Sequence, residues 1–213
     1  MTELDPAEAA AGADSWDALA AAVSACVVCD ELAGTRQQTV PGVYPRGAGA
    51  RSLMVVGEAP GASEDEQGLP FVGRSGELLD SLLVEAGSSR DRVVVANVLK
   101  CRPPMNRPPL RREVLACRPW LARQLMIADP AVVVAMGSTA VTWFLGPGAR
   151  IGDVRGEPIE RDGYLLVATF HPSAALRFGP RGKPMAALRE DLALAVRLLD
   201  PREGPPRTTR PYL

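Results

Sequence analysis

The sequence lacks the features that mark a membrane or secreted protein. It has no apolar run long enough to cross a bilayer. Its N-terminus has neither the basic region nor the apolar core of a secretory signal peptide. We therefore expect a cytoplasmic protein with no membrane partner, and the richness in Ala, Arg, Gly and Pro suggests a GC-rich prokaryotic genome. In a reducing compartment, cysteines stay free to bind metal.

The chain also lacks an excess of charge of either sign. Its net charge is −1, which by itself argues against a partner as negative as nucleic acid. Residues 1–17 hold acids and no base, however, so the remainder is net positive. Basic residues gather in two groups: Arg102, Arg107, Arg111 and Arg112, and then Arg177, Arg181, Lys183 and Arg189. Such groups are either solvated faces or tracks for a phosphate backbone.

Cysteine is scarce, and its spacing is informative. Cys26 and Cys29 form a C-x2-C pair, and Cys101 and Cys117 follow as a second pair. No fifth cysteine exists, so one four-thiolate site would use them all. Four sulfur ligands favour an iron–sulfur cluster or a tetrahedral zinc, with disulfides as the remaining alternative. Because 213 residues can bury a full core, a metal here would be a local clamp.

Apolar runs alternate with helical patterns along the chain, which predicts an α/β fold. Buried strands are expected at 53–56, 93–96, 131–136 and 164–169. Helices are expected at 16–28, 76–86, 111–128 and 183–199, with another beginning at Ser138. Such alternation indicates a mostly parallel sheet covered on both faces. We expect one domain at 14–200, an α/β/α sandwich around a four-stranded sheet, with disordered residues at 1–13 and 201–213.

Ligands of such a sheet bind outside the carboxyl ends of its strands. Those ends carry residues 57–61, Asn97, residues 137–138 and His171, so four distant segments are expected to meet at one edge. Asn97 offers one acceptor and two donors, which match the edge of a pyrimidine but also suit a loop cap. His171, the only histidine, could touch a ligand or be structural. Glu58 could act in the site or be a surface acid, and Phe71 could stack on a base or fill the core.

Three segments of the chain resemble the active-site segments of the family 4 uracil-DNA glycosylases. The first is GEAPG at 57–61 followed by GLPFVGRSG at 68–76, the second is NVLKCRPP at 97–104, and the third is FHPS at 170–173 with Leu176 and Arg177. The four cysteines match the ligands of the [4Fe-4S] cluster of that family. The similarity runs from about residue 26 to about residue 199, which is most of the domain.

The resemblance implies a monofunctional DNA repair enzyme that hydrolyses the N-glycosidic bond of uracil and leaves an abasic site. Its substrate would be uracil-containing DNA, single- or double-stranded, from which the nucleotide is flipped into a pocket. It implies that Asn97 binds the uracil edge, that Phe71 stacks on the ring, and that His171 donates to the departing base. It implies that Glu58 positions water or stabilises the sugar cation.

The resemblance also assigns the contacts around the pocket. Gly57, Ala59 and Gly61 would form the substrate-binding loop, Ser138 and Ser173 would bind flanking phosphates, and Leu176 would wedge into the base stack. Cys26, Cys29, Cys101 and Cys117 would hold a structural [4Fe-4S] cluster, with zinc as the alternative. The cluster would brace the basic loop at 102–112 beside the DNA of a monomeric enzyme.

Two departures from related families leave alternatives open. The first family of uracil glycosylases has an aspartate where this chain, like family 4, has Ala59, and it has a thymine-excluding tyrosine near Gly61. A broader specificity for mispaired or deaminated bases is therefore one alternative, and a non-catalytic DNA-binding module is another. A related branch bonds covalently to the abasic sugar through a histidine in the loop after the second segment. Residues 103–110 contain no histidine, so we expect ordinary turnover.

Overall fold

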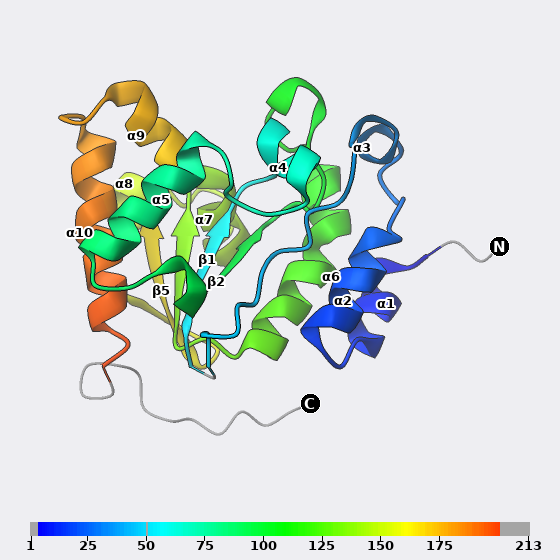
Figure 1. Cartoon of the computed structure of the whole chain (residues 1–213), viewed down its shortest axis with the longest axis horizontal. Coiled ribbons are helices and arrows are strands. Elements are labelled where there is room, and N and C mark those ends of the chain that lie inside the picture. Colours follow the sequence, from blue (N-terminus) through cyan, green and yellow to red (C-terminus); the bar gives the residue numbers. More distant parts are fainter. Residues whose placement is uncertain (1–3, 50, 201–213) are drawn as a thin grey trace.

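The structure, a computed structural model, describes residues 4–49 and 51–200 and is built around one five-stranded sheet (Figure 1). The strands are β1 (Leu53–Gly57), β2 (Val93–Asn97), β3 (Val132–Met136), β4 (Ile159–Arg161) and β5 (Tyr164–Thr169). Their order is β2-β1-β3-β5-β4. Neighbouring strands among β2, β1, β3 and β5 pair in parallel, and β4 runs antiparallel to β5. The predicted α/β class with a mostly parallel sheet is confirmed.

The predicted number of strands was wrong, because the sheet has a fifth strand. β4 contains three residues, of which Ile159 is half-buried and the other two are exposed. A short edge strand with polar residues has no apolar run to reveal it. The four longer strands are buried along their whole length, which is why their apolar runs were recognisable.

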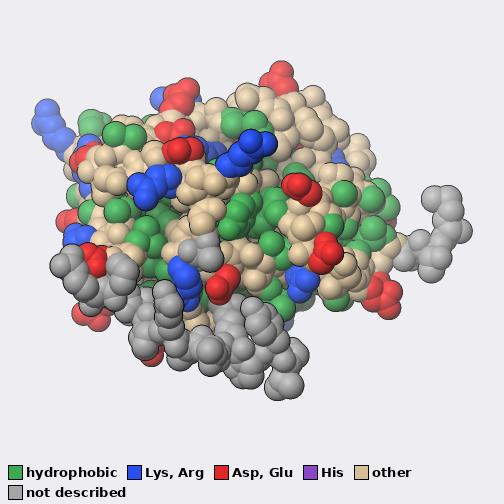
Figure 2. All heavy atoms as spheres, turned by 60° about the horizontal axis from the view of Figure 1, so that its bottom comes forward, with side chains coloured by type: hydrophobic (Ala, Val, Ile, Leu, Met, Phe, Trp, Pro, Cys, Tyr) green, Lys and Arg blue, Asp and Glu red, His purple; other side chains and the backbone are tan. Residues whose placement is uncertain are grey.

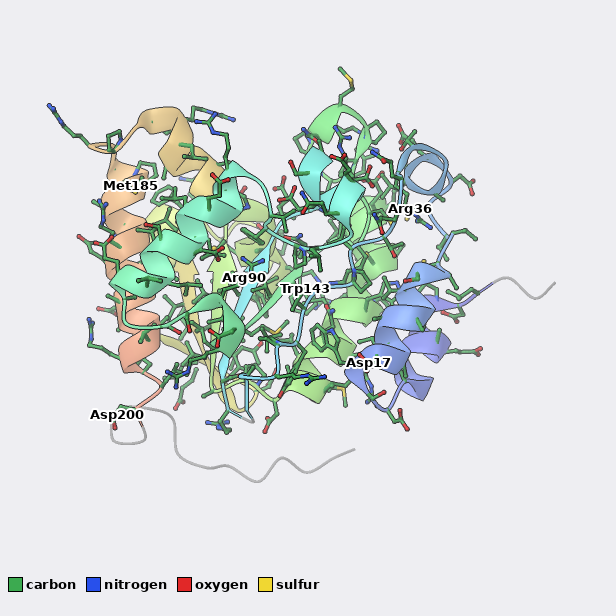
Figure 3. All side chains as sticks on the ribbon, viewed as in Figure 1. Asp17, Arg36, Arg90, Trp143, Met185 and Asp200 are labelled. Carbon is green, nitrogen blue, oxygen red and sulfur yellow. The ribbon has the colours of Figure 1, made fainter. Side chains whose placement is uncertain are left out.

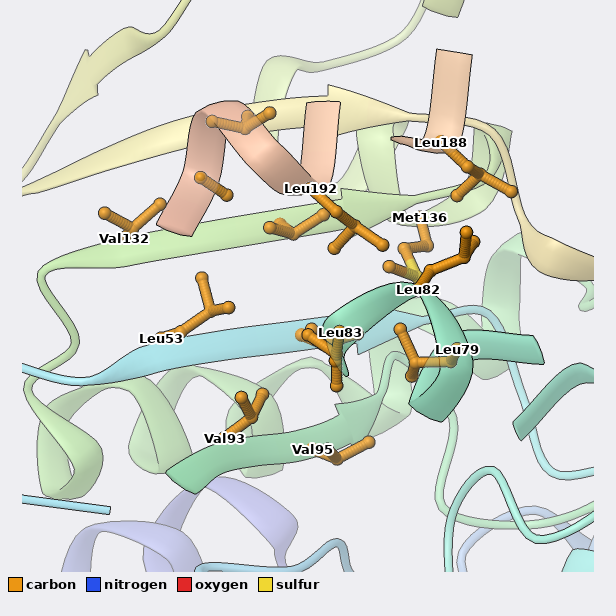
Figure 4. Packing of buried hydrophobic residues seen from close by; sticks show 14 of the residues in the cluster. Leu53, Leu79, Leu82, Leu83, Val93, Val95, Val132, Met136, Leu188 and Leu192 are labelled. Atoms are coloured by element: carbon orange, nitrogen blue, oxygen red, sulfur yellow. The ribbon is translucent and has the colours of Figure 1, made fainter. Parts of the chain in front are cut away.

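Helices cover both faces of the sheet and divide the core in two. One face is covered by α5 (Arg74–Glu85) and α10 (Lys183–Arg197), with α9 (Pro172–Phe178) packed against both. Leu53 of β1 points into this half of the core (Figure 4), and Val55 belongs to the same cluster. The alternate residues Met54 and Val56 point into the other half, beneath α6 (Arg111–Ala128) and α7 (Ser138–Leu145). This alternation follows from the two-residue repeat of a strand.

The N-terminal part forms an outer layer on α6 (Figure 1). Residues 1–13 were expected to be disordered, but α1 (Pro6–Gly12) is a helix that is capped by Asp5 and packs on α6. Its alanine-rich face fits because small side chains let Ala10 and Ala13 join a cluster with Trp120. Residues 1–3 and 201–213 lie outside the described residues, so the expected disorder there and the domain bounds 14–200 stay predictions.

The second helix is shorter than predicted, which moves the first cysteine pair. α2 (Trp16–Ser24) begins after its cap Ser15 as expected but ends four residues before residue 28. Cys26 therefore lies in a loop, and Cys29 immediately precedes α3 (Asp30–Thr35). The remaining short elements are α4 (Ala62–Gln67), α8 (Ile151–Val154), η1 (Arg90–Arg92) and η2 (Pro104–Asn106). Within the described residues, no helix is long and apolar enough to cross a membrane.

The end of the molecule opposite the carboxyl edge of the sheet has a mixed surface. Figure 2 brings this end forward and shows basic and acidic side chains interspersed among apolar ones. No large patch of one sign stands out among the side chains that are coloured there. A surface of this kind does not select a polyanion.

Candidate active site and four-cysteine site

A cleft lies where the carboxyl ends of the parallel strands meet, at the top of Figure 1 between α9 and α4. Its volume is about 590 Å³. Glu58, Phe71, Asn97 and His171 line it together, although they lie in separate segments of the sequence. The expected convergence at one sheet edge is therefore present, because each residue follows or ends a parallel strand or lies in the loop after one.

Asn97 presents an unsatisfied polar atom to this cleft. It is the last residue of β2 and is 2% exposed, and its Oδ1 has no hydrogen-bond partner among the described residues. A buried acceptor without a partner costs on the order of 1–3 kcal/mol, which a donor on a ligand would offset. Gly57 stands opposite on β1, and a Cβ there would lie 2.4 Å from this oxygen. Glycine at position 57 thus leaves the room that the Asn97 amide and the Phe71 ring occupy.

Phe71 forms one wall of the cleft in an unusual backbone conformation. Its φ is 53°, the left-handed region that costs a bulky residue about 1–2 kcal/mol. The turn is held closely by Gly76, where a Cβ would lie 1.7 Å from the Phe71 carbonyl oxygen. The Phe71 ring is 5.5 Å from that of His171, and it also belongs to the apolar core. Phe71 can therefore fill the core and also offer a face on which a base could stack.

His171 is oriented by hydrogen bonding at its Nδ1. Its Nδ1 accepts a hydrogen bond from the backbone N–H of Ser173 at 3.2 Å and lies 2.8 Å from the Ser173 hydroxyl. A backbone N–H can only donate, so Nδ1 is an acceptor and the neutral ring carries its proton on Nε2. Burial lowers the pKa of His171 to about 4, although the nearby Glu64 carboxylate opposes this shift. The ring is thus neutral at pH 7.

Glu58 is half-buried at the border between the cleft and an adjoining hollow of about 350 Å³. Its Oε2 accepts a hydrogen bond from the Thr139 hydroxyl on the first turn of α7. This bond fixes the carboxylate at the rim of the cleft. Sequence reasoning did not find Thr139, because nothing in its local pattern indicates a partner so distant along the chain.

Glu64 is a second residue that sequence reasoning missed, and it organises the loop around the cleft. Its carboxylate accepts hydrogen bonds from Gly61 N at 3.1 Å, Val72 N at 3.1 Å and Gly73 N at 3.2 Å. It therefore ties the start of α4 to the turn that carries Phe71. The available signal was a glutamate three residues after a helix N-cap, a common capping arrangement.

The other predicted contact residues surround the cleft at its mouth. Ala59, Gly61 and Ser173 line it, and Ser138 lines the adjoining hollow. Leu176 is 37% exposed on α9 and lies outside the cleft lining. Their expected roles toward DNA stay predictions.

The two groups of basic residues differ in how far they are already paired. In the first group, Arg107 is bound by Glu113 at 2.6 Å and by Glu31 at 2.8 Å. In the second group, Arg189 is bound by Glu85 at 2.9 Å. Arg177 lines both the cleft and the hollow beside it. The guanidinium best placed for a ligand at the cleft is therefore that of Arg177.

The four cysteines come together around one small, partly open hollow beside α3 and α6. All four are free thiols, so the disulfide alternative does not hold. The described residues include no group of three or more His, Cys, Asp or Glu side chains placed to grip a single metal ion. A zinc ion and an iron–sulfur cluster would each use the same four thiolates. The grouping of the cysteines is as expected, but the identity of the metal stays a prediction.

The surroundings of this hollow are apolar and carry positive charge. Burial raises the pKa of Cys117 to about 12 and that of Cys29 to about 11. Arg36, beside α3 in Figure 3, donates to Cys101 Sγ at 3.0 Å and to the Cys26 carbonyl oxygen at 2.6 Å. Lys100 is also buried beside the thiols. The thiols of Cys29 and Cys117 are thus neutral by themselves, and a bound metal would deprotonate them.

Comparisons with known proteins agree with this geometry. A family model described as the uracil DNA glycosylase superfamily matches residues 44–193. A type-4 uracil-DNA glycosylase of Pyrobaculum aerophilum is 41% identical over 190 residues, which cover 81% of this chain and 93% of that protein. One of Thermotoga maritima is 48% identical over 127 residues, 59% of this chain and 66% of that protein. A type-5 enzyme of P. aerophilum is 34% identical over 139 residues, 57% of this chain and 61% of that protein.

Proposed function

This chain belongs to the uracil-DNA glycosylase superfamily, and within it to the type-4 enzymes, and from this premise we propose that it excises uracil from DNA as a step of base excision repair. The observation that carries the proposal is the buried, unpartnered Oδ1 of Asn97 beside Phe71 and the protonated Nε2 of His171. An acceptor, an aromatic wall and a neutral donor together match the groups of a uracil ring.

Asn97 selects uracil by the order of donors and acceptors on its amide. Uracil offers an N3–H donor to the Oδ1 of Asn97 and an O4 acceptor to its amide N–H. Cytosine reverses both groups, so it would leave buried polar atoms unpaired at a cost of about 1–3 kcal/mol for each. The amide therefore rejects cytosine while Phe71 supplies a face on which either pyrimidine could stack.

His171 acts on the bond that breaks. As the bond between C1′ and N1 lengthens, its electron pair moves onto uracil, and the Nε2–H donates to the O2 oxygen where negative charge grows. A donor aimed at developing charge stabilises the transition state more than the ground state. Glu58, held by Thr139, stabilises the cationic sugar or positions the water that adds to C1′. Water supplies the hydroxyl group of the abasic product, and its remaining proton leaves to solvent.

DNA reaches these groups only if the nucleotide is flipped out of the helix. Leu176 on α9 would fill the gap left in the base stack. Ser138 and Ser173 at the mouth would hold the flanking phosphates, and Arg177 adds positive charge there. We propose a monomer as the working unit. A cytoplasmic location in a prokaryote stays a prediction.

We further propose that Cys26, Cys29, Cys101 and Cys117 hold a [4Fe-4S] cluster. Their shared hollow, the flanking cations and the all-sulfur donor set support it. When bound, the cluster cross-links the loop after α2 to the segment that follows Asn97. A brown protein with four irons per chain is the expected result, and a colourless protein with stoichiometric zinc would contradict it.

Release of free uracil from a uracil-containing oligonucleotide tests the main proposal. Asn97→Ala and His171→Ala should each lower the excision rate by about 100-fold or more, with non-specific DNA binding nearly unchanged. Unchanged rates in both variants would refute the assignment of these residues. Parallel assays on G·T and hypoxanthine pairs address the broader specificity that Gly61 leaves open, and DNA binding without any base release would identify a non-catalytic module.

The absence of histidine from residues 103–110 leads to a separate test. The enzyme should release its abasic product and turn over. Denaturing electrophoresis after reaction with uracil-containing DNA should show free protein only. A protein band that stays attached to the DNA would mean that a covalent link forms.

A further inference from the structure

Lys100 is a buried cation that takes no part in the excision steps proposed above. It is one of only two lysines in the chain, and it is 1% exposed. Its Nζ donates to the main-chain oxygen of Asn97 at 2.5 Å and to Gln124 Oε1 at 2.6 Å. A buried ammonium is costly unless its hydrogen bonds are made, so these two contacts need an explanation.

The Asn97 oxygen needs such a donor because β2 is an edge strand. On this outer edge, Val95 N and O are both bonded to Val43, at 3.0 and 2.8 Å. Asn97 lies two residues further along, so its carbonyl faces the same edge. The bridge to Val43 is an isolated one and does not extend as far as Asn97. Lys100 thus donates the hydrogen bond that a neighbouring strand would otherwise donate to Asn97, the residue that would bind uracil.

The other end of the contact is anchored in α6. Gln124 is 1% exposed, and its Nε2 donates to the Pro41 carbonyl oxygen, which orients Oε1 toward Lys100. The same helix carries Cys117. Lys100 therefore joins the end of β2 to the helix that lies behind it.

We propose that Lys100 is a positioning residue for base recognition, which holds the main chain of Asn97 so that its amide stands at the correct depth in the cleft. This inference rests on the proposed function. A misplacement of about 1 Å in a catalytic site can cost about 100-fold in rate. Removal of Lys100 should therefore weaken the binding of uracil itself, which a residue that only stabilised the fold would not do.

Lys100→Met tests the inference because methionine keeps an unbranched apolar stem and removes every donor. Excision in a single turnover should slow by about 10- to 100-fold. Free uracil, the reaction product, should inhibit about 10-fold more weakly, whereas affinity for uracil-free DNA should stay the same. The visible absorbance per chain and the melting temperature show whether the variant is folded and holds its metal.

Gln124→Leu provides a second test if Lys100→Met does not fold. It removes the anchor on α6 and leaves every cysteine and every residue of the cleft in place. Inhibition by uracil should weaken, as in Lys100→Met. The double variant should be less impaired than the sum of the two single effects, as expected for residues in one network.

Arg123→Met is the matched control on the same helix. It removes a hydrogen bond of 2.7 Å to the Ala13 carbonyl oxygen, on the side that faces the outer layer. Its inhibition by uracil should equal that of the unchanged protein even if its melting temperature falls. If uracil inhibits Lys100→Met and Gln124→Leu as strongly as it inhibits the unchanged protein, and the unchanged protein excises uracil, the inference on Lys100 is wrong while the proposed function stands. Failure of the unchanged protein to release uracil would overturn the proposed function as well.

Discussion

At the residue scale, the space beside Gly57 is as important to the cleft as the groups that line it. A Cβ at this position would lie 2.4 Å from Asn97 Oδ1 and 2.6 Å from Phe71 Cζ. Both are nearer than real Cβ contacts, so an added methyl group would push the amide and the ring apart. The selectivity attributed to Asn97 depends on this missing side chain.

Gly57→Ala should therefore lower uracil excision by about 100-fold while the protein stays folded. The reason is displacement of Asn97 and Phe71, and the measurement is the single-turnover rate together with the circular dichroism spectrum. Gly12→Ala is the control, since a Cβ at the end of α1 meets nothing within 4 Å. Full activity in Gly57→Ala would show that the cleft tolerates the extra group.

The neutral ring of His171 predicts how stability depends on pH. Its pKa is about 4 in the folded protein, whereas an unfolded chain has the ordinary value of 6.5. Between these values the unfolded state binds a proton that the folded state does not, so stability falls as pH decreases from 6.5 toward 4. His171→Gln should remove about 1–2 kcal/mol of this decrease, an amount reduced because the ring is partly open to solvent.

Urea unfolding at pH 7.5 and pH 5 measures this difference in both proteins. The unchanged protein should lose more stability between the two pH values than His171→Gln does. An equal loss in the two proteins would mean that His171 titrates normally. Excision should likewise show no loss from protonation of His171 until the pH approaches 4.

The sequence indicated residues of the cleft where they lie at or just after the end of a strand. Asn97 and His171 were found because parallel strands bring their carboxyl ends to one edge. Glu64 and Thr139 were not found, since their roles depend on contacts that form only in the folded chain. The left-handed turn at Phe71 has no local signal either, because Gly76, which makes room for it, lies five residues away.

At the element scale, α8 and α10 are joined by an ion pair remote from the chemistry. Arg155, which follows α8, contacts the two carboxylate oxygens of Asp191 at 2.9 Å each, and Asp191 is 1% exposed. Asp191→Ala should destabilise the protein by about 3–5 kcal/mol because a cation loses its buried partner. Uracil excision per folded molecule should be unaffected.

Glu190→Ala is the matched control for this pair. Glu190 contacts the same guanidinium at 2.8 Å, but its side chain is 68% exposed. An exposed pair contributes about 0–1 kcal/mol, so the melting temperature should hardly change. Equal losses of stability in the two variants would show that burial is not what distinguishes the two contacts.

Whole elements were predicted best where an apolar pattern was long. The helix at 111–128 and the strand at 164–169 have the predicted bounds, because each buries a continuous set of apolar side chains. The edge strand β4 and the alanine-rich α1 have little apolar surface of their own, and both depend on a neighbour. The helix from residue 16 ends early because residues 26–29 turn toward the hollow of the four cysteines.

At the scale of the whole molecule, the outer layer is attached through few elements. α1 and α2 pack on α6 and on each other, and the loop after α2 carries two of the four cysteines. A metal centre would therefore contribute much of the attachment of this layer. The sheet, with its two apolar cores, does not depend on it.

Cys26→Ser should loosen the outer layer and leave the sheet intact. Hydrogen exchange should quicken by about 10-fold or more at residues 16–24 and stay slow in β1 and β3, since regions of a protein open independently. Loss of protection throughout the chain would contradict the independence of the two parts. Ser24→Ala, an exposed position at the end of the same helix, is the control.

The distance along the chain between the two cysteine pairs also sets an order of events during biosynthesis. Cys26 and Cys29 leave the ribosome early, but the hollow is incomplete until Cys117 and the rest of α6 have been made. Until then Leu19 and Val23 of α2 lack their partner Trp120 and stay open to solvent. Since translation proceeds at about 5–20 residues per second, the first half of the chain waits for seconds with two thiols and an apolar helix unprotected. Loading of the proposed cluster would therefore have to follow translation of α6, because an N-terminal fragment alone contains only two of the four thiols.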